Sequence, residues 1–257
     1  MAITVTALST TPVKGTRLHT VDAVELTERG ARGDRSFYIV DDGGRMVNGK
    51  VIGELQAVVA DHDEAAGELT LTFPDGAEVR APLVGGETVQ TRFFSRPREA
   101  LALTGPWHEA LSAFAGRPLQ IVQVPSAVDR GRQGAASLIS RASLARLAQA
   151  GDQPEIDARR FRMLIEIDGV GAHEEDGWVG RRVQVGEALL RMHGHVGRCL
   201  ITSRDPDSGE VDLPTLDLLG TYRRDTDSTE PLPFGIHGAV LEPGAVRVGD
   251  AVALADG

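Results

Sequence analysis

Apolar and polar residues alternate along most of this chain, and the alternation constrains its fold more than any other feature of the sequence. Successive side chains of a β-strand point to opposite faces, so a period of two predicts strands with one buried face. The alternating segments are short and numerous, and turn-forming residues separate many of them. We expect strands at residues 3–7, 21–26, 36–40, 45–47, 55–60, 68–73, 77–81, 119–124, 160–167, 181–185, 188–192, 200–203, 239–242 and 246–254.

Four turn sequences predict how neighbouring strands connect. Asp42-Gly43-Gly44 tolerates positive φ and predicts a hairpin. Ala66-Gly67 and Pro74-Asp75-Gly76 predict two further turns of a β-meander. Asp205-Pro206-Asp207-Ser208-Gly209 is typical of a tight turn, and a functional role for its carboxylates is the alternative interpretation.

Helical periodicity is confined to a few short segments. In residues 106–114, Trp107, Leu111 and Phe114 recur at helical spacing, and Gly116 is placed to end the helix. A second helical segment is expected to begin at Ser140 or Ser143, and a third is expected to span residues 214–223. Many short strands with few helices predict a mainly β (α+β) fold built as a barrel or a sandwich.

Charge and composition exclude several classes of protein. The chain carries 27 Lys+Arg against 37 Asp+Glu, a formal net charge of -10, and both of its halves are acidic. This balance argues against a nucleic-acid partner and against an anionic membrane surface. No apolar run approaches the roughly 20 residues of a membrane helix. The first residues lack the charged and apolar regions of a signal peptide, so we expect a cytoplasmic location.

The lone cysteine, Cys199, is the first candidate functional residue, and with no second cysteine an intrachain disulfide is impossible. Arg198 and Arg204 lie nearby, and cationic neighbours favour the thiolate, the form that ligates metals. An inert thiol in a strand is the alternative. His193 and His195 would share one face of a strand, so with Cys199 they form a candidate three-ligand zinc or iron site. A solvated or hydrogen-bonded histidine pair is the alternative there.

A second group of candidates is cationic or hydroxyl-bearing and lies in loop-like segments. Lys14 and Arg35 can bind a phosphate, the lysine as a point charge and the arginine as a planar fork. Solvated surface charges are the alternative. The same ambiguity holds for Ser137, Ser140, Arg160 and Arg162. Together these side chains can surround an anionic cofactor.

The segment Gly197-Arg198-Cys199-Leu200-Ile201-Thr202, followed by residues 205–210, resembles the core of MOSC-domain proteins. These are relatives of the C-terminal domain of molybdenum-cofactor sulfurase and of the mitochondrial amidoxime-reducing component. Other segments match the family in the same order along the chain. They are residues 11–15 (family Y-P-V-K-S), 33–37 (G-D-R), 137–144 (a serine-rich helix entry), 160–162 (R-F-R-P-N) and 234–250 (the closing strands).

The resemblance implies a MOSC β-barrel in residues 125–257, packed with a MOSC N-terminal β-barrel-like domain in residues 1–124. The segment 124–134 is rich in Pro, Gly and Arg without any period, as expected of a loop at this boundary. The resemblance also implies a molybdenum cofactor (molybdopterin) whose metal is bound by Cys199, the catalytic residue, and a soft thiolate suits that metal. The implied cofactor-binding residues are Lys14, Arg35, Ser137, Ser140 and Arg162. Kinship with the sulfurase adds pyridoxal phosphate binding as an expected property.

The first functional hypothesis is therefore a molybdenum-dependent oxidoreductase. By resemblance, it reduces N-hydroxylated small molecules such as amidoximes, hydroxamates or hydroxylaminopurines. The chain has no C-x4-C-x2-C run for an iron–sulfur cluster, so the electrons are expected from a separate reductase. An acidic surface suits a reductase with a basic docking face.

Departures from the family pattern support a second hypothesis. Met163 and Leu164 stand where the family has Pro-Asn, which removes a polar cofactor contact, and Gly15 replaces a serine. The leucine favours a carrier of the cofactor or of sulfur that has no turnover of its own. A third hypothesis is a protein with another metal, held by the two histidines and the cysteine described above.

Overall fold

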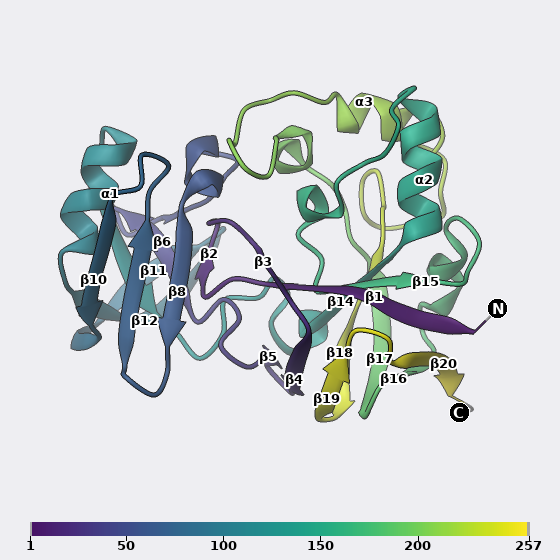
Figure 1. Ribbon diagram of the computed structural model, residues 1–257, viewed down its shortest axis with the longest axis horizontal. Coiled ribbons are helices and arrows are strands. Elements are labelled where there is room, and N and C mark those ends of the chain that lie inside the picture. Colours follow the sequence, from purple (N-terminus) through teal and green to yellow (C-terminus); the bar gives the residue numbers. More distant parts are fainter. Residues whose placement is uncertain (1, 256–257) are drawn as a thin grey trace.

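Strands from both ends of the chain close into a β-barrel in the computed structural model, which describes residues 2–255 (Figure 1). Within these residues the closed order is β15 (Ile165–Asp168), β14 (Ala136–Ser140), β18 (Ile236–Glu242), β17 (Ala188–His195), β16 (Arg182–Val185), β20 (Ala251–Ala255) and β1 (Ile3–Thr10), which pairs again with β15. Alternate apolar side chains fill the interior; Val183 and Val185 on β16 and Leu190 on β17 are fully buried. Helix α2 (Arg141–Ala150) connects the parallel strands β14 and β15.

A second lobe, at the left of Figure 1, has an apolar core of its own. Its larger sheet has the order β11 (Val84–Phe93), β12 (Arg96–Thr104), β13 (Leu119–Gln123), β6 (Phe37–Asp41) and β2 (Val13–Lys14), with β7 (Met46–Val47) also on β6. Its smaller sheet is β10 (Glu78–Pro82), β9 (Glu68–Thr72) and β8 (Val59–Asp63). Helix α1 (Trp107–Ala115) buries Trp107, whose Nε1 donates to the Leu69 carbonyl at 2.8 Å. The predicted stop at Gly116 is confirmed, with a left-handed φ of 65°.

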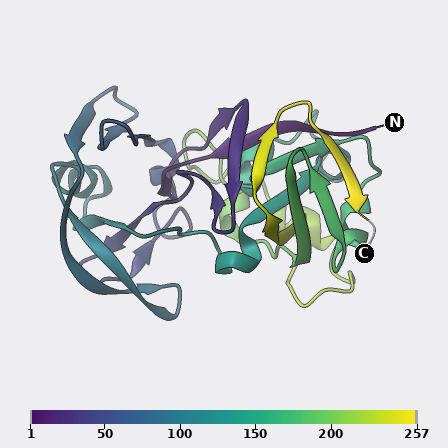
Figure 2. The same ribbon diagram turned by 90° about the horizontal axis from the view of Figure 1, so that it is seen from below.

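The first strands of the chain fold with the barrel, so the two lobes are interleaved in sequence. β3 (His19–Val21) pairs with β1, and β4 (Ala23–Thr27) lies between β5 (Gly30–Ala31) and β19 (Gly244–Arg247). Figure 2 shows these strands, in purple, crossing from between the lobes onto the barrel. A division at residue 124 therefore separates β1 from the C-terminal barrel that this strand completes.

The mainly β fold class is confirmed, and four of the expected strands are corrected. Residues 53–57 form a 3-10 turn, η1 (Gly53–Ala57), before β8 begins. Residues 158–161 form η3 (Ala158–Phe161), which ends at Arg162 in a left-handed conformation that a strand cannot accommodate. Residues 200–203 form η5 (Leu200–Ser203), because the Thr202 amide and hydroxyl both donate to the Cys199 carbonyl. Residues 246–254 contain two strands, β19 and β20, separated by a turn at residues 248–250.

The long hairpin β11–β12 is absent from the expected strands because most side chains of β11 are exposed, which leaves no apolar alternation to detect. The expected turns hold: Gly44, Gly67 and Gly76 all have positive φ between paired strands. The third helical segment is confirmed as α3 (Thr215–Gly220), shorter than expected. Among the described residues, no helix combines the length and the apolar character needed to cross a bilayer.

Candidate functional site

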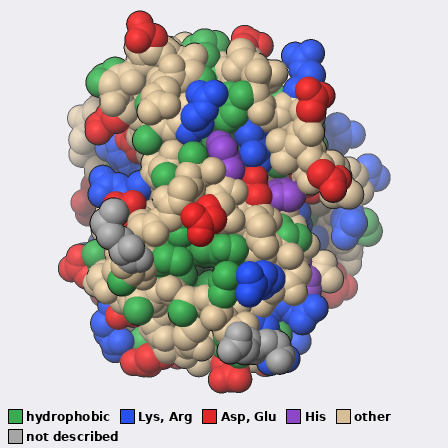
Figure 3. All heavy atoms as spheres, turned by 90° about the vertical axis from the view of Figure 1, so that its right-hand side faces the viewer, with side chains coloured by type: hydrophobic (Ala, Val, Ile, Leu, Met, Phe, Trp, Pro, Cys, Tyr) green, Lys and Arg blue, Asp and Glu red, His purple; other side chains and the backbone are tan. Residues whose placement is uncertain are grey.

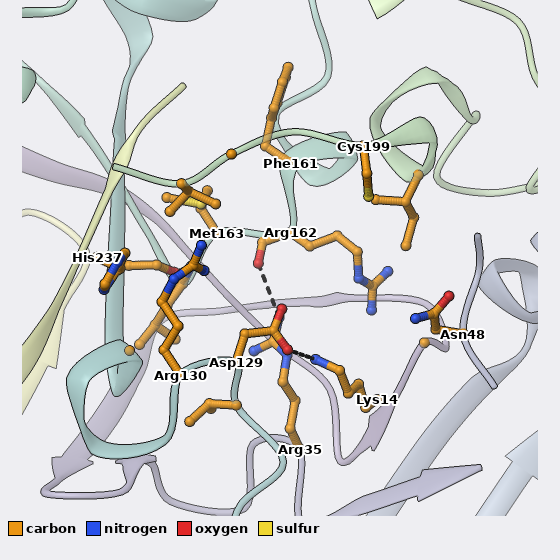
Figure 4. A pocket seen from close by; sticks show the side chains of 18 of the residues that line it. Lys14, Arg35, Asn48, Asp129, Arg130, Phe161, Arg162, Met163, Cys199 and His237 are labelled. Carbon is orange, nitrogen blue, oxygen red and sulfur yellow. Dashed lines mark hydrogen bonds and ion pairs between the residues drawn. The ribbon is translucent and has the colours of Figure 1, made fainter. Parts of the chain in front are cut away.

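A pocket of about 640 Å³ lies where the two lobes meet the loop that joins them. This volume is in the range of small-molecule and cofactor sites. Five of the six site residues implied by the resemblance line it: Lys14, Arg35, Ser137, Arg162 and Cys199. The further candidate Arg160 does not line it and pairs with Asp212 instead. The five that line the pocket come from β2, from the loop before β6, from β14, from the end of η3 and from the start of η5. Figure 4 shows the lysine, the two arginines and the cysteine facing a common space.

The pocket is strongly cationic in an acidic protein. Its lining carries six basic side chains, Lys14, Arg35, Lys50, Arg130, Arg162 and Arg198, against two carboxylates, Asp34 and Asp129. The chain as a whole has a formal net charge of -10. Charge of this sign, concentrated in one concave site, attracts an anionic ligand. On the barrel face drawn in Figure 3, by contrast, acidic and basic side chains are interspersed.

Lys14, Arg35 and Arg162 form what we call the cation cluster, and hydrogen bonds to neighbouring residues hold its two arginines in place. The Arg35 guanidinium pairs with Asp34, and its Nη2 donates to the Arg162 carbonyl at 3.0 Å. The Arg162 Nη2 donates to the Thr16 carbonyl at 2.7 Å. A guanidinium has five N–H donors, so each arginine keeps donors for a ligand.

Backbone strain is concentrated at this pocket. Seven non-glycine residues of the described chain have positive φ, and four of them line the pocket: Arg35, Phe94, Arg130 and Arg162. Left-handed conformations cost non-glycine residues about 1–3 kcal/mol and persist where surrounding structure enforces them, frequently at functional sites. The surrounding structure therefore holds Arg35 and Arg162, two members of the cation cluster, in backbone conformations that are unfavourable for these residues.

Burial makes the charges of the cluster costly. It lowers the pKa of Lys14, and the nearby charges of Arg35 and Arg162 act in the same direction, against the attraction of Asp129. Burial also lowers the pKa of Arg162 to about 9, with Arg35 again contributing. With a pKa of about 9, Arg162 stays cationic at neutral pH. An anion in the cluster relieves the repulsion among its members and restores lost solvation.

Cys199 lies at the end of an extended segment, with φ of -138° and ψ of 177°, and its side chain is exposed to the pocket. The preceding Arg198 is buried and fixes this segment to the barrel. Its Nη1 donates to the Phe161 carbonyl at 2.9 Å and its Nε to the Phe234 carbonyl at 2.8 Å. The thiol is therefore presented by a rigid support, as a metal ligand requires.

Ser137 and Ser140, two residues apart on β14, have different roles. The Ser137 hydroxyl lines the pocket and accepts from the Leu164 amide at 2.9 Å, which leaves its own proton free to donate. Ser140 does not line the pocket, so the structure does not support its expected cofactor contact. Its Oγ caps α2 by accepting from the Ser143 amide at 3.1 Å and donates to the buried carboxylate of Glu175 at 2.9 Å. Burial raises the pKa of Glu175, against the opposing effect of these serine hydrogen bonds.

We expect Ser140→Ala to lower the free energy of unfolding by about 2–4 kcal/mol, because it removes a helix cap and one partner of a buried carboxyl group. Cofactor content per folded chain should stay unchanged. Urea unfolding and pterin analysis measure the two effects, with Ser208→Ala as an exposed control. Loss of cofactor without loss of stability would return Ser140 to the binding site.

The three-ligand site of His193, His195 and Cys199 does not form. A β-bulge lies between Met192 and Gly194 on β17, so the two histidines lose the common face that a regular strand would give them. His195 instead lies 3.7 Å from Asp176. Across the residues that the structure describes, no group of three or more His, Cys, Asp or Glu is arranged to hold a metal ion.

Several pocket residues could not be identified from the sequence. Asn48 and Lys50 follow β7, and Asp129 and Arg130 lie in the segment that was expected only as a boundary loop. The composition of that segment, rich in Pro, Gly and Arg, was the available signal. His237 on β18 also lines the pocket, and its Nδ1 lies 2.8 Å from the Gln133 carbonyl.

Comparison with known proteins assigns both parts of the chain. Residues 2–112 match the model of the MOSC N-terminal beta barrel domain, and residues 125–253 match that of the MOSC domain. The Xenopus laevis mitochondrial amidoxime-reducing component 1 is 26% identical over 94% of this chain and 79% of its own length. The Bos taurus mitochondrial amidoxime reducing component 2 is 27% identical over 97% and 82%. The Oryza sativa molybdenum cofactor sulfurase is 25% identical over 83% of this chain but 30% of its own length.

Proposed function

The chain belongs to the MOSC family, and on that premise we propose that it binds a molybdopterin-type cofactor between its lobes and reduces N-hydroxylated small molecules. One observation carries the proposal: six basic side chains and an exposed thiol line the same pocket. The names of the amidoxime-reducing relatives support the reaction class.

The residues of the pocket fit such a cofactor chemically. The cation cluster, with the Ser137 hydroxyl, offers charge-assisted hydrogen bonds to a terminal phosphate. Cys199 offers one soft ligand, as a thiophilic metal prefers. The bound group supplies two-electron redox chemistry, and the protein supplies the ligand, the orientation and the pocket. Pyridoxal phosphate binding stays a prediction, since the chain matches 30% of the sulfurase's length.

The proposed reaction needs a separate electron donor. Converting an N-hydroxylated substrate to the corresponding N–H compound breaks the N–O bond, consumes two electrons and two protons, and releases water. The substrate is a small molecule and the donor is a separate reductase. The cytoplasmic location stays a prediction, since the named relatives are mitochondrial.

The carrier hypothesis remains the second candidate because of Leu164. The family pattern has an asparagine at this position. The Leu164 side chain packs in the barrel core, and its amide already donates to the Ser137 hydroxyl. A carrier binds the cofactor without turning over. The two functions therefore differ in activity and agree in cofactor content.

A turnover assay separates these two functions. We expect the loaded protein, supplied with a chemically reduced viologen dye, to convert an aromatic amidoxime to the amidine with two electrons consumed per product. The dye removes the need for the natural reductase. Cofactor bound in full with no amidine formed would favour the carrier instead.

A further inference from the structure

Asp129 lies against the cation cluster and has no role in the function proposed above. We propose that its carboxylate is a built-in competing anion, which holds Lys14 and must be displaced by the phosphate of an incoming ligand. The inference rests on the proposed function only in placing an anionic ligand at the cation cluster. It adds that Asp129 lowers the affinity of the cluster for that ligand.

The ion pair between Asp129 and Lys14 is close, and its two members differ in freedom. The Lys14 Nζ lies 2.6 Å from the Asp129 Oδ1. The lysine side chain is 11% exposed and the aspartate side chain is 49% exposed. The carboxylate can therefore move into solvent, whereas the ammonium stays in the pocket wall. Figure 4 shows the carboxylate between Lys14 and Arg35, within the space that the cation cluster faces.

Asp34, the other carboxylate of the pocket, is fixed by comparison. It is 5% exposed, pairs with Arg35, and accepts from the Thr11 amide at 2.8 Å. Its removal would leave a buried charge without a partner and release the loop that carries Lys14. Of the two acidic groups among the described lining residues, Asp129 is thus the one that a ligand can displace.

The backbone around Asp129 is anchored, so displacement needs only a side-chain rotation. Arg130 has a left-handed φ of 66°, and its Nη2 lies 2.6 Å from the Glu230 carboxylate. Gln133, further along the loop, is bonded through its carbonyl to His237 at 2.8 Å. These contacts hold the loop to the barrel whether or not Asp129 contacts the lysine.

A phosphate can overcome this competition, whereas a carboxylate cannot. A carboxylate from solution would exchange one charge-assisted hydrogen bond to Lys14 for another and gain little. A phosphate monoester carries a charge of about -1.5 to -2 and three acceptor oxygens, so it can contact all three members of the cluster at once. Asp129 weakens every anion by a similar factor, and the phosphate retains enough affinity to occupy the site.

The test measures inorganic phosphate binding by calorimetry. It uses the full-length chain purified from a host that cannot make the cofactor, at constant ionic strength. We expect Asp129→Asn to bind phosphate about 10- to 100-fold more tightly than the wild type, the range for one charge-assisted hydrogen bond. Glu28→Gln is the matched control, because it removes an exposed carboxylate that pairs with Arg132 of the same loop, does not line the pocket and does not contact Lys14. This control should change the affinity less than twofold.

A double-mutant cycle separates competition for Lys14 from general repulsion. In a Lys14→Met background, Asp129→Asn should give no gain in phosphate affinity, because the contact that it frees is already absent. A gain that persists in that background would overturn the inference in favour of repulsion. Equal or weaker phosphate binding by Asp129→Asn alone would also overturn it, and would leave the proposed function standing. If no variant binds phosphate, the anion site at the cation cluster falls as well.

Discussion

Cys199→Ser is expected to abolish molybdenum-dependent turnover and to weaken metal retention while the protein stays folded. The chain holds no second thiolate that can replace it. A serine hydroxyl is a hard, protonated oxygen at neutral pH and is a poor ligand for a thiophilic metal. Because the side chain is exposed and makes no capping hydrogen bond, the free energy of unfolding should change by no more than about 0.5 kcal/mol.

The experiment compares turnover, molybdenum content and urea unfolding for Cys199→Ser and for Leu200→Ala. Leu200 is the next residue and is also exposed, so its variant controls for disturbance of the segment. The control should keep its metal. A serine variant with wild-type activity and bound molybdenum would remove the cysteine from the mechanism.

Loss of Lys14 and Arg35 is expected to have the second largest effect, on cofactor retention. A charge-assisted hydrogen bond contributes roughly 1.5–3 kcal/mol, so each substitution should weaken cofactor binding by about 10- to 100-fold. The double variant Lys14→Ala, Arg35→Ala should lose nearly all its pterin during gel filtration. The thermal stabilisation that the cofactor provides should fall with it.

The control for this experiment is an arginine outside the pocket. Arg96 is exposed and suits a control substitution, whereas Arg98 stacks on Phe93 and donates to the Ser126 carbonyl, so it does not. Arg35→Ala also breaks a buried pair with Asp34, which costs about 3–5 kcal/mol of folding stability. The single variant Lys14→Met keeps the pair of Arg35 with Asp34 and so avoids that loss of stability. Pterin is measured per folded chain for every variant. If the double variant keeps pterin as well as Arg96→Ala does, the phosphate lies elsewhere.

Local patterns predicted the parts of the fold that local physics decides. Alternation located most barrel strands, since each buries one face, and Gly116 located the end of α1. The same rule fails at residues 200–203, where hydrogen bonds back to the Cys199 carbonyl make a 3-10 turn. It also fails for β11, whose exposed side chains show no alternation. Interleaving of the lobes depends on long-range pairing of β1, which no local pattern reports.

The grouping of candidate residues in one pocket was predictable where chemistry and family pattern coincide. Lys14, Arg35, Ser137, Arg162 and Cys199, distant in sequence, all line one pocket. Ser140 shows the limit of pattern matching, because it lies two residues from Ser137 on β14 and supports a helix cap instead. Asp129 carries no motif and lies in a segment without period, so only the three-dimensional structure brings it to the pocket.

Molybdenum and pterin content of the wild-type chain, purified from a host that makes the cofactor, tests the central claim most directly. The account predicts both in amounts equimolar with the chain, with the pterin lost when Lys14 and Arg35 are replaced. Protein that is folded, carries neither, and holds zinc or iron instead would contradict it.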